Sequence, residues 1–284
     1  MRPPPTDEST QKLHVLVVTY PRFGHIVPLL ELSRKIAKHH YVTFVIFQCS
    51  YEELLEKELY SDAEKDTFKL YILEDELDMA HANSMAFHDS FVYMWDNTIT
   101  AVRQLLSVVP TPSNPKSSLD FANPIDVVVG NIFVAKAMPV CVERNIPYYL
   151  FEPGNVDFIK YALLLDERTP TISNDATDAF MSPVSHNNTI DAVAEVFKHC
   201  WLPIKDAFPD CKGIVVNSTR DLEKRTIAEC EKDHLLKNTS FLCSTTSEGN
   251  CRGLVGAKSA IRVIFKDNSS WLSVGRDQRL NRKL

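Results

Sequence analysis

Glycine is scarce in this sequence, and the glycine patterns that bind phosphate groups are missing. Only 8 of the 284 residues are glycine, no G-x-G-x-x-G follows an expected strand, and no G-x-x-x-x-G-K occurs. The first pattern is typical of dinucleotide-binding folds and the second of P-loop nucleotide hydrolases. A nicotinamide-dependent oxidoreductase is therefore disfavoured, and no phosphate-binding loop is expected.

The chain also lacks the charge and cysteine patterns of several other classes. Its net charge is -6, and its Lys and Arg residues form no stripe, so nucleic acid is not an expected partner. Its seven cysteines are an odd number without a C-x-x-C pair, which argues against a zinc site and against a disulfide framework. We expect free thiols, no metal and no bound cofactor.

Long apolar runs are absent as well. No uninterrupted stretch of about 18 apolar residues is present to span a bilayer. Residues 1–12 form a polar, proline-rich tail without the apolar segment of a secretion signal. With 44% hydrophobic and 24% charged residues, the composition is that of a globular protein. The expected location is the cytoplasm, without a membrane span.

Residues 13–47 have the pattern of a strand, a helix and a second strand. Leu13–Thr19 is a short apolar run of the kind found in parallel sheets that are covered on both faces. Pro21 and Gly24 mark a break, Pro28 suits the first turn of a helix, and Val42–Phe47 reads as the next strand. The pattern predicts a βαβ unit.

His25 lies in the expected turn after the first strand, next to Gly24. Open α/β sheets bind their ligands at the carboxyl edge of the sheet, so a histidine in this turn is well placed for chemistry. The alternative is a surface-loop histidine, which any βαβ protein can have. A single Gly-His pair does not decide between the two.

Two later segments repeat the strand-and-helix pattern. In residues 124–151 we expect a buried strand, a turn at Gly130 and Asn131, a helix over Phe133–Arg144 and a further strand. Residues 212–230 read as another strand followed by a helix. The predicted fold is α/β, a Rossmann-like parallel sheet with helices on both faces.

Residues 87–109 form a long amphipathic helical pattern, with Trp95 on its apolar face. Such a stripe belongs more often to the core than to a binding site. Residues 152–155 follow a strand end and so could face a ligand.

The order of these motifs resembles the UDP-dependent glycosyltransferases that act on small lipophilic acceptors. Gly24, His25 and Pro28 match the G-H-x-x-P turn of that family. A later strand ending with Asn217 and Ser218, followed by a Leu-Glu pair, matches a structural element of the same family. The resemblance implies an enzyme that transfers a sugar from a UDP-sugar to an acceptor hydroxyl.

The resemblance also implies roles for individual residues. His25 would be the general base, and Asn131 stands where the family has the aspartate that orients this base. Gly24, His88, Trp95 and Asn155 would contact the acceptor. UDP-sugar would be a co-substrate and not a cofactor.

The asparagine at position 131 departs from the family pattern. An amide can hydrogen-bond an imidazole, but it supplies no negative charge to stabilise the imidazolium. In the catalytic triad of a serine protease, the same Asp-to-Asn change lowers turnover about 10⁴-fold. Asp126 lies at the opposite end of the expected strand and is a poor substitute. Asn131 could also be there simply as a turn former.

The resemblance covers residues 13–240, which would be the acceptor-side domain of a two-domain glycosyltransferase. Residues 241–284 are divergent, and nothing in them matches the nucleotide-sugar domain that follows in the family. We therefore expect a truncated chain that is weak or inactive alone and that uses UDP-sugar only if a donor domain is supplied. The alternatives are a binding module for lipophilic small molecules and an unstable fragment.

Overall fold

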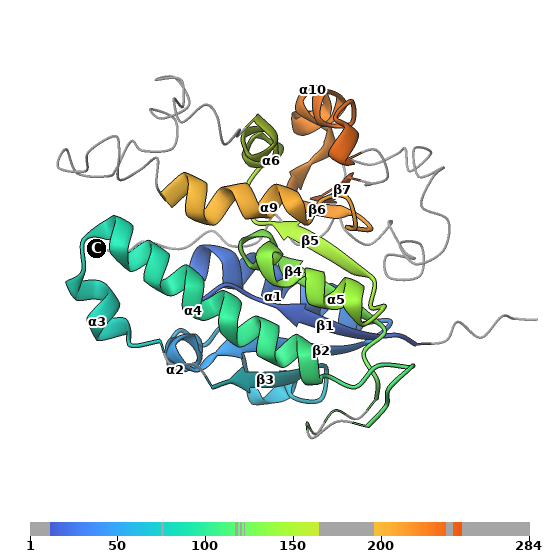
Figure 1. The fold of residues 1–284 in the computed structure, drawn as a ribbon. Coiled ribbons are helices and arrows are strands. Elements are labelled where there is room, and N and C mark those ends of the chain that lie inside the picture. The colour runs from blue at the N-terminus through green and yellow to red at the C-terminus, as the bar shows by residue number, and fades with distance from the viewer. Residues whose placement is uncertain are drawn as a thin grey trace, which may run out of the picture.

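The computed structural model describes residues 12–74, 77–116, 119, 121, 123–164, 196–236 and 241–245. These residues form a seven-stranded sheet in the order β3-β2-β1-β4-β5-β6-β7, in which all neighbouring strands are parallel (Figure 1). The strands are β1 (His14–Val18), β2 (Tyr41–Phe47), β3 (Lys69–Leu73), β4 (Val127–Asn131), β5 (Tyr148–Glu152), β6 (Ile214–Thr219) and β7 (Phe241–Thr245).

Helices follow most of these strands. The α-helices are α1 (Phe23–Ala37), α2 (Gln48–Glu56), α3 (Met79–Ser84), α4 (Phe87–Val108), α5 (Pro139–Glu143), α6 (Val156–Leu164), α9 (Leu202–Asp206) and α10 (Arg220–Cys230). The shorter helical turns are η1 (Asp62–Glu64), η2 (Ile132–Ala137), η3 (Phe197–Trp201) and η4 (His234–Leu236).

The sheet is buried on both faces, as its continuous apolar strands predict. Val15 and Val17 belong to the core that α1 covers, whereas Leu16 and Val18 belong to the core that α4 covers. Figure 1 shows α1 and α4 on opposite sides of the sheet. The prediction of a Rossmann-like α/β sheet with helices on both faces is therefore confirmed.

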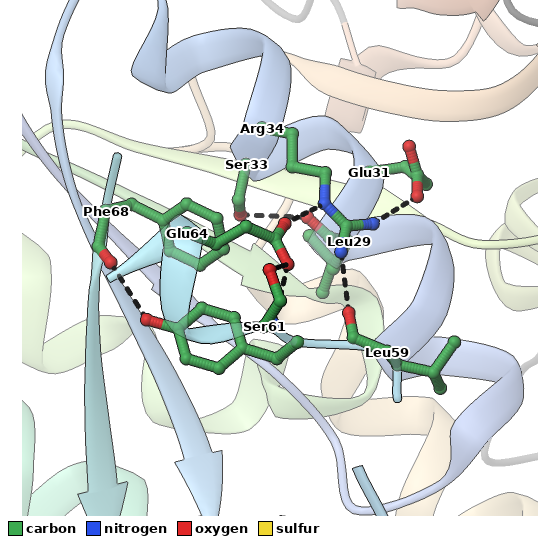
Figure 2. A network of polar contacts seen from close by, with 9 residues as sticks. Leu29, Glu31, Ser33, Arg34, Leu59, Ser61, Glu64 and Phe68 are labelled. Atoms are coloured by element: carbon green, nitrogen blue, oxygen red, sulfur yellow. Dashed lines mark hydrogen bonds and ion pairs between the residues drawn. The ribbon is translucent and has the colours of Figure 1, made fainter. Parts of the chain in front are cut away.

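A network of hydrogen bonds and ion pairs connects α1 to the segment between α2 and β3 (Figure 2). The Arg34 guanidinium donates to Glu64 Oε1 at 2.6 Å, to the Leu59 carbonyl at 2.6 Å and to Glu31. Glu64 in turn accepts hydrogen bonds from the backbone and the hydroxyl of Ser61. One half-buried arginine thus joins two segments that lie 30 residues apart.

The first helix begins earlier than predicted. Pro28 does not lie in its first turn, because α1 starts at Phe23 and Pro28 is inside the helix. Proline lacks the N–H that would bond to the carbonyl of Gly24, so the helix lacks one backbone hydrogen bond at this point. His25 is consequently part of the first helical turn and not of a loop, which corrects the expectation from the sequence.

The second predicted turn and helix also differ. Gly130 and Asn131 are the last two residues of β4, and the predicted helix over Phe133–Arg144 is divided into η2 and α5. Pro139 explains the division, because it has no N–H with which to continue η2 and suits the first position of α5.

The proposed domain boundary at residue 240 lies just before β7, which pairs in parallel with β6 as an edge strand of the sheet. Residues 1–11 of the expected polar tail and residues 246–284 of the expected divergent tail lie outside the described residues.

Candidate active site

Three polar or aromatic residues lie at or just beyond the carboxyl ends of neighbouring strands. Tyr20 comes two residues after β1, Asn131 is the last residue of β4, and Glu152 is the last residue of β5. All three are buried. Because the strands are parallel, these residues lie along one edge of the sheet, where open α/β folds bind ligands.

His25 joins this edge from the first turn of α1. Its backbone N–H donates to the Arg22 carbonyl at 2.8 Å, and its ring Nδ1 lies 3.2 Å from Asn131 Oδ1. The imidazole is half-buried. Helix α1 and strand β4 are thus linked side chain to side chain at the carboxyl edge.

The amide of Asn131 has one orientation that fits its surroundings. Asn131 Oδ1 accepts the backbone N–H of Phe133 at 2.9 Å, which caps η2. A rotated amide would place its NH₂ against that N–H, donor against donor. The oxygen therefore also faces His25, so Nδ1 of the ring carries the proton and donates it to Oδ1. The lone pair of His25 is then on Nε2.

The surroundings of His25 favour the neutral imidazole. Burial lowers its pKa to about 4, the hydrogen bond with Asn131 raises it in part, and the positive charge of Arg22 lowers it further. A neutral amide cannot offset the cost of a partly buried charge as a carboxylate would. Asp126, the nearby aspartate in sequence, accepts the backbone N–H of His14 at 2.8 Å at the other end of the strands.

Aromatic rings surround the imidazole. The His25 ring centroid lies 4.7 Å from that of Phe133 and 5.3 Å from that of Tyr20. Trp95, from α4, lies 5.5 Å from Phe133 and 6.3 Å from Tyr20. Trp95 is completely buried, so it belongs to the core and at the same time borders the site.

Of the other predicted contact residues, Gly24 is adjacent to His25 and exposed, and a Cβ atom placed on it would meet nothing within 4 Å. His88 lies two turns before Trp95 on α4, and its Nε2 is 3.1 Å from Asp89 Oδ1. Asn155 is exposed, and its Oδ1 accepts the N–H of Asp157 at the start of α6. The structure brings His25, Asn131 and Trp95 together, and it gives His88 and Asn155 contacts of their own.

Sequence reasoning missed three residues that border His25, namely Arg22, Tyr20 and Phe133. Tyr20 and Phe133 each lie two residues beyond a residue that closes a strand, Val18 and Asn131. That spacing was a usable signal, because the residues that follow parallel strands gather at one edge. Nothing in the sequence indicated the position of the Arg22 side chain.

Glu152 is a second unusual ionisable group at the same edge. Burial raises the pKa of its carboxyl to about 8, although the N–H of Gly154, 2.7 Å from Oε1, lowers it in part. Near neutral pH this carboxyl is therefore largely protonated.

Among the residues in the described ranges, no group of three metal-binding side chains is found. No helix in the same ranges has the length and apolar character needed to cross a bilayer. Cys141, Cys200, Cys211 and Cys230 are buried free thiols.

Comparisons with known proteins find relatives among curated sequences and solved structures. No known family profile matches the chain. UDP-glycosyltransferase 72E1 from Arabidopsis thaliana is 22% identical over 240 residues, which are 79% of this chain and 47% of that protein. The chain spans about half the length of the curated relatives it matches.

Solved structures show the same fold. The crystal structure of Arabidopsis thaliana UGT89C1 complexed with UDP-L-rhamnose has a TM-score of 0.56 and 20% identity, over 82% of this chain and 52% of that one. Medicago truncatula UGT71G1 complexed with UDP-glucose has a TM-score of 0.55 and 19% identity, over 78% of this chain and 49% of that one. In sequence and in fold, the chain therefore resembles one half of a UDP-glycosyltransferase, the family that its motifs predicted.

Proposed function

We propose that this chain provides the acceptor side of a glycosyltransferase that moves a sugar from a UDP-sugar to a small lipophilic acceptor. The observation that carries the proposal is the contact between His25 Nδ1 and Asn131 Oδ1 at the carboxyl edge of the sheet. It leaves Nε2 of the ring able to accept a proton. The half-buried ring of Phe133, 4.7 Å from the imidazole, offers apolar surface for the acceptor, and the buried rings of Tyr20 and Trp95 pack against it.

With a hydroxyl acceptor, His25 would act as general base. Nε2 takes the hydroxyl proton while the acceptor oxygen bonds to the anomeric carbon, and the bond from that carbon to the phosphate oxygen breaks. UDP leaves with the electron pair. The chain's own contribution is the position of the acceptor and the removal of its proton, both of which lower the barrier.

The base is weak in this chain. A pKa of about 4 means that the ring gives up a proton far more readily than an ordinary histidine does. We therefore expect slow transfer to simple alcohols. Asn131→Asp would supply the missing negative charge and speed up that transfer.

A chimera tests the proposal, because the chain covers about half of its relatives. The whole chain is fused to the complementary half of a matched plant relative, and transfer from UDP-glucose to a phenol is followed by product mass and UDP release. We expect Asn131→Asp to raise turnover and His25→Ala to abolish it. His39→Ala, at an exposed position just after the same helix, is the matched control. Unchanged turnover in His25→Ala would remove the proposed base.

A second candidate is a binding module that holds a lipophilic molecule without transfer. The lowered pKa of His25, caused by burial and by the charge of Arg22, favours it because a base with a low pKa is weak. Calorimetry on the unfused chain separates the candidates. Binding of UDP-glucose supports the enzyme, whereas acceptor affinity without UDP-glucose binding, together with an inactive chimera, supports the binding module.

A further inference from the structure

Hydrogen-bond donors without partners gather around His25. Tyr20 Oη, Trp95 Nε1 and Asn131 Nδ2 are buried atoms with no hydrogen-bond partner. Their residues are 1% exposed for Tyr20 and fully buried for Trp95 and Asn131. Most buried polar atoms in folded proteins do have a partner. The indole and the amide nitrogen can only donate, so the missing partner is a group that accepts hydrogen bonds.

These donors belong to one cluster of side chains. The Tyr20 ring lies 5.3 Å from the His25 ring and 6.3 Å from the Trp95 ring. Asn131 Nδ2 is the second arm of the amide whose oxygen contacts His25. Tyr20 and Asn131 therefore border the imidazole, and Trp95 borders Tyr20.

The side chain of Arg22 places a positive charge beside this cluster. Arg22 is exposed and precedes α1, and its Nη2 lies 2.9 Å from Met94 Sδ on α4. Burial lowers the pKa of His25 and raises that of Tyr20, and the charge of Arg22 has a smaller effect that lowers both. None of the ion pairs found within the described ranges includes Arg22. Asp96, two residues after Met94 on α4, has its Oδ1 2.8 Å from His199 Nε2.

Arginine beside neutral donors is a suitable site for a carboxylate. The planar guanidinium matches the two oxygens of a carboxylate, and hydrogen bonds to a charged acceptor are stronger than neutral ones. A carboxylate is also ionised at neutral pH, with a pKa of about 4 in amino-acid side chains. It needs no base to become a nucleophile, whereas an alcohol does.

We propose that the preferred acceptor of this site is an aromatic carboxylate, which Arg22, Tyr20 and Asn131 hold and which receives the sugar on its carboxylate oxygen. This inference rests on the proposed function and names its substrate class. The carboxylate oxygen bonds to the anomeric carbon of the UDP-sugar, the bond from that carbon to the phosphate oxygen breaks, and UDP leaves with the electron pair. No proton moves, and the product is a sugar ester.

Three probes with one carbon skeleton test the binding of the unfused chain at pH 7 by calorimetry. Cinnamate carries the charge, cinnamamide is its neutral isostere, and cinnamyl alcohol carries the hydroxyl. We expect cinnamate to bind at least tenfold more tightly than either neutral probe. A thermal melt of every sample confirms that the chain is folded.

Variants assign the preference to named groups. Arg22→Gln should remove most of the tenfold preference without lowering the melting temperature, because the side chain is exposed. Arg103→Gln, which changes an exposed arginine on α4, should leave it intact. Asn131→Asp should weaken cinnamate binding through charge repulsion and spare cinnamyl alcohol.

The outcomes separate the two proposals. Equal affinity for the three probes, tighter binding of the alcohol, or a preference that survives Arg22→Gln would overturn the carboxylate inference and leave the proposed function standing. If the folded chain binds none of the three, both proposals are overturned.

Discussion

His25 and Asn131 are 106 residues apart in the chain, yet their side chains meet with 3.2 Å between Nδ1 and Oδ1. The same amide oxygen caps η2 through the N–H of Phe133. One oxygen thus closes a helical turn and selects the tautomer of the imidazole. The remaining amide nitrogen has no partner. This arrangement leads to the first prediction.

Asn131→Asp should raise the pKa of His25 from about 4 by at least about one unit, because a carboxylate within hydrogen-bond reach stabilises the imidazolium. The side-chain NMR signals of His25, followed against pH, measure the change. His14 is an internal control, because it lies at the amino end of β1 and its ring bonds to Thr43 and to the Asn123 carbonyl. An unchanged His25 titration would mean that the amide does not set its protonation.

Two glycine substitutions should have opposite effects on stability. Gly24→Ala places a methyl group in open space within α1 and should stabilise the fold by up to about 0.5–1 kcal/mol. Gly130→Ala brings a Cβ to 3.0 Å from Met138 Cε and 3.2 Å from Val134 Cγ2, and should destabilise it by about 1 kcal/mol.

Urea unfolding measures both effects. The Gly24 variant has a further use, because Gly24 is adjacent to His25 and is proposed to contact the acceptor. Weaker acceptor binding by a chain that is more stable would show that the acceptor approaches across Gly24. Equal stability of the two variants would contradict the packing described for Gly130.

Glu152→Gln should reduce the loss of folding stability that the parent protein shows as the pH rises from 5 to 8. The folded chain holds the Glu152 proton up to about pH 8, whereas the unfolded chain releases it near 4.5. Between these values the folded state binds more protons, so the free energy of unfolding falls as pH rises.

For a carboxyl so deeply buried, the loss amounts to a few kcal/mol by pH 8. Denaturant unfolding at pH 5 and pH 8 measures it in both proteins. The parent should lose stability between the two pH values, and the glutamine variant should lose distinctly less. Parallel losses would place the pH dependence elsewhere.

Arg34→Ala should destabilise the fold by about 1–2 kcal/mol, since it removes charged hydrogen bonds in a half-buried setting. Burial raises the pKa of Glu64, but its bonds with Arg34 and Ser61 lower it more, so the net shift is downward. The stability that Glu64 contributes to the folded state is therefore fully present above about pH 4.5 and is lost as the pH falls through its folded pKa.

Thermal melts at pH 7 and pH 3 check this prediction, and the difference between parent and variant should shrink at pH 3. Arg225→Ala is the control, because Arg225 bonds to Glu229 on the surface with its side chain 92% exposed. Such a pair contributes less than about 1 kcal/mol. A loss in Arg34→Ala that is no larger than in this control would show that the network adds nothing.

The strands were predictable because a parallel sheet covered on both faces requires continuous apolar runs, and β1 is a run of this kind. The proximity of His25 and Asn131 was implied by the resemblance to the glycosyltransferase family, and it agrees with the rule that residues at the ends of parallel strands gather at one edge. Pro28 misled the helix assignment, because proline is usual in the first turn of a helix and here it lies in the second turn.

Other parts of the site depend on packing that a linear pattern does not contain. The apolar stripe of α4 indicates that Trp95 faces inward, but not that it meets Tyr20 and Phe133. The rotation of the Asn131 amide depends on the N–H of Phe133, and the position of Arg22 depends on Met94. Each is a contact between segments that only the folded chain brings together.

The start of α1 at Phe23 has a consequence for how such a site can evolve. Ile26, Leu29 and Leu30 anchor the helix in the core directly behind His25. The position of the imidazole is thus fixed by the packing of α1 against the sheet. In the proposed enzyme, new acceptors would be accommodated by exchanging the side chains opposite the ring, while Nε2 of His25 would stay where the core holds it.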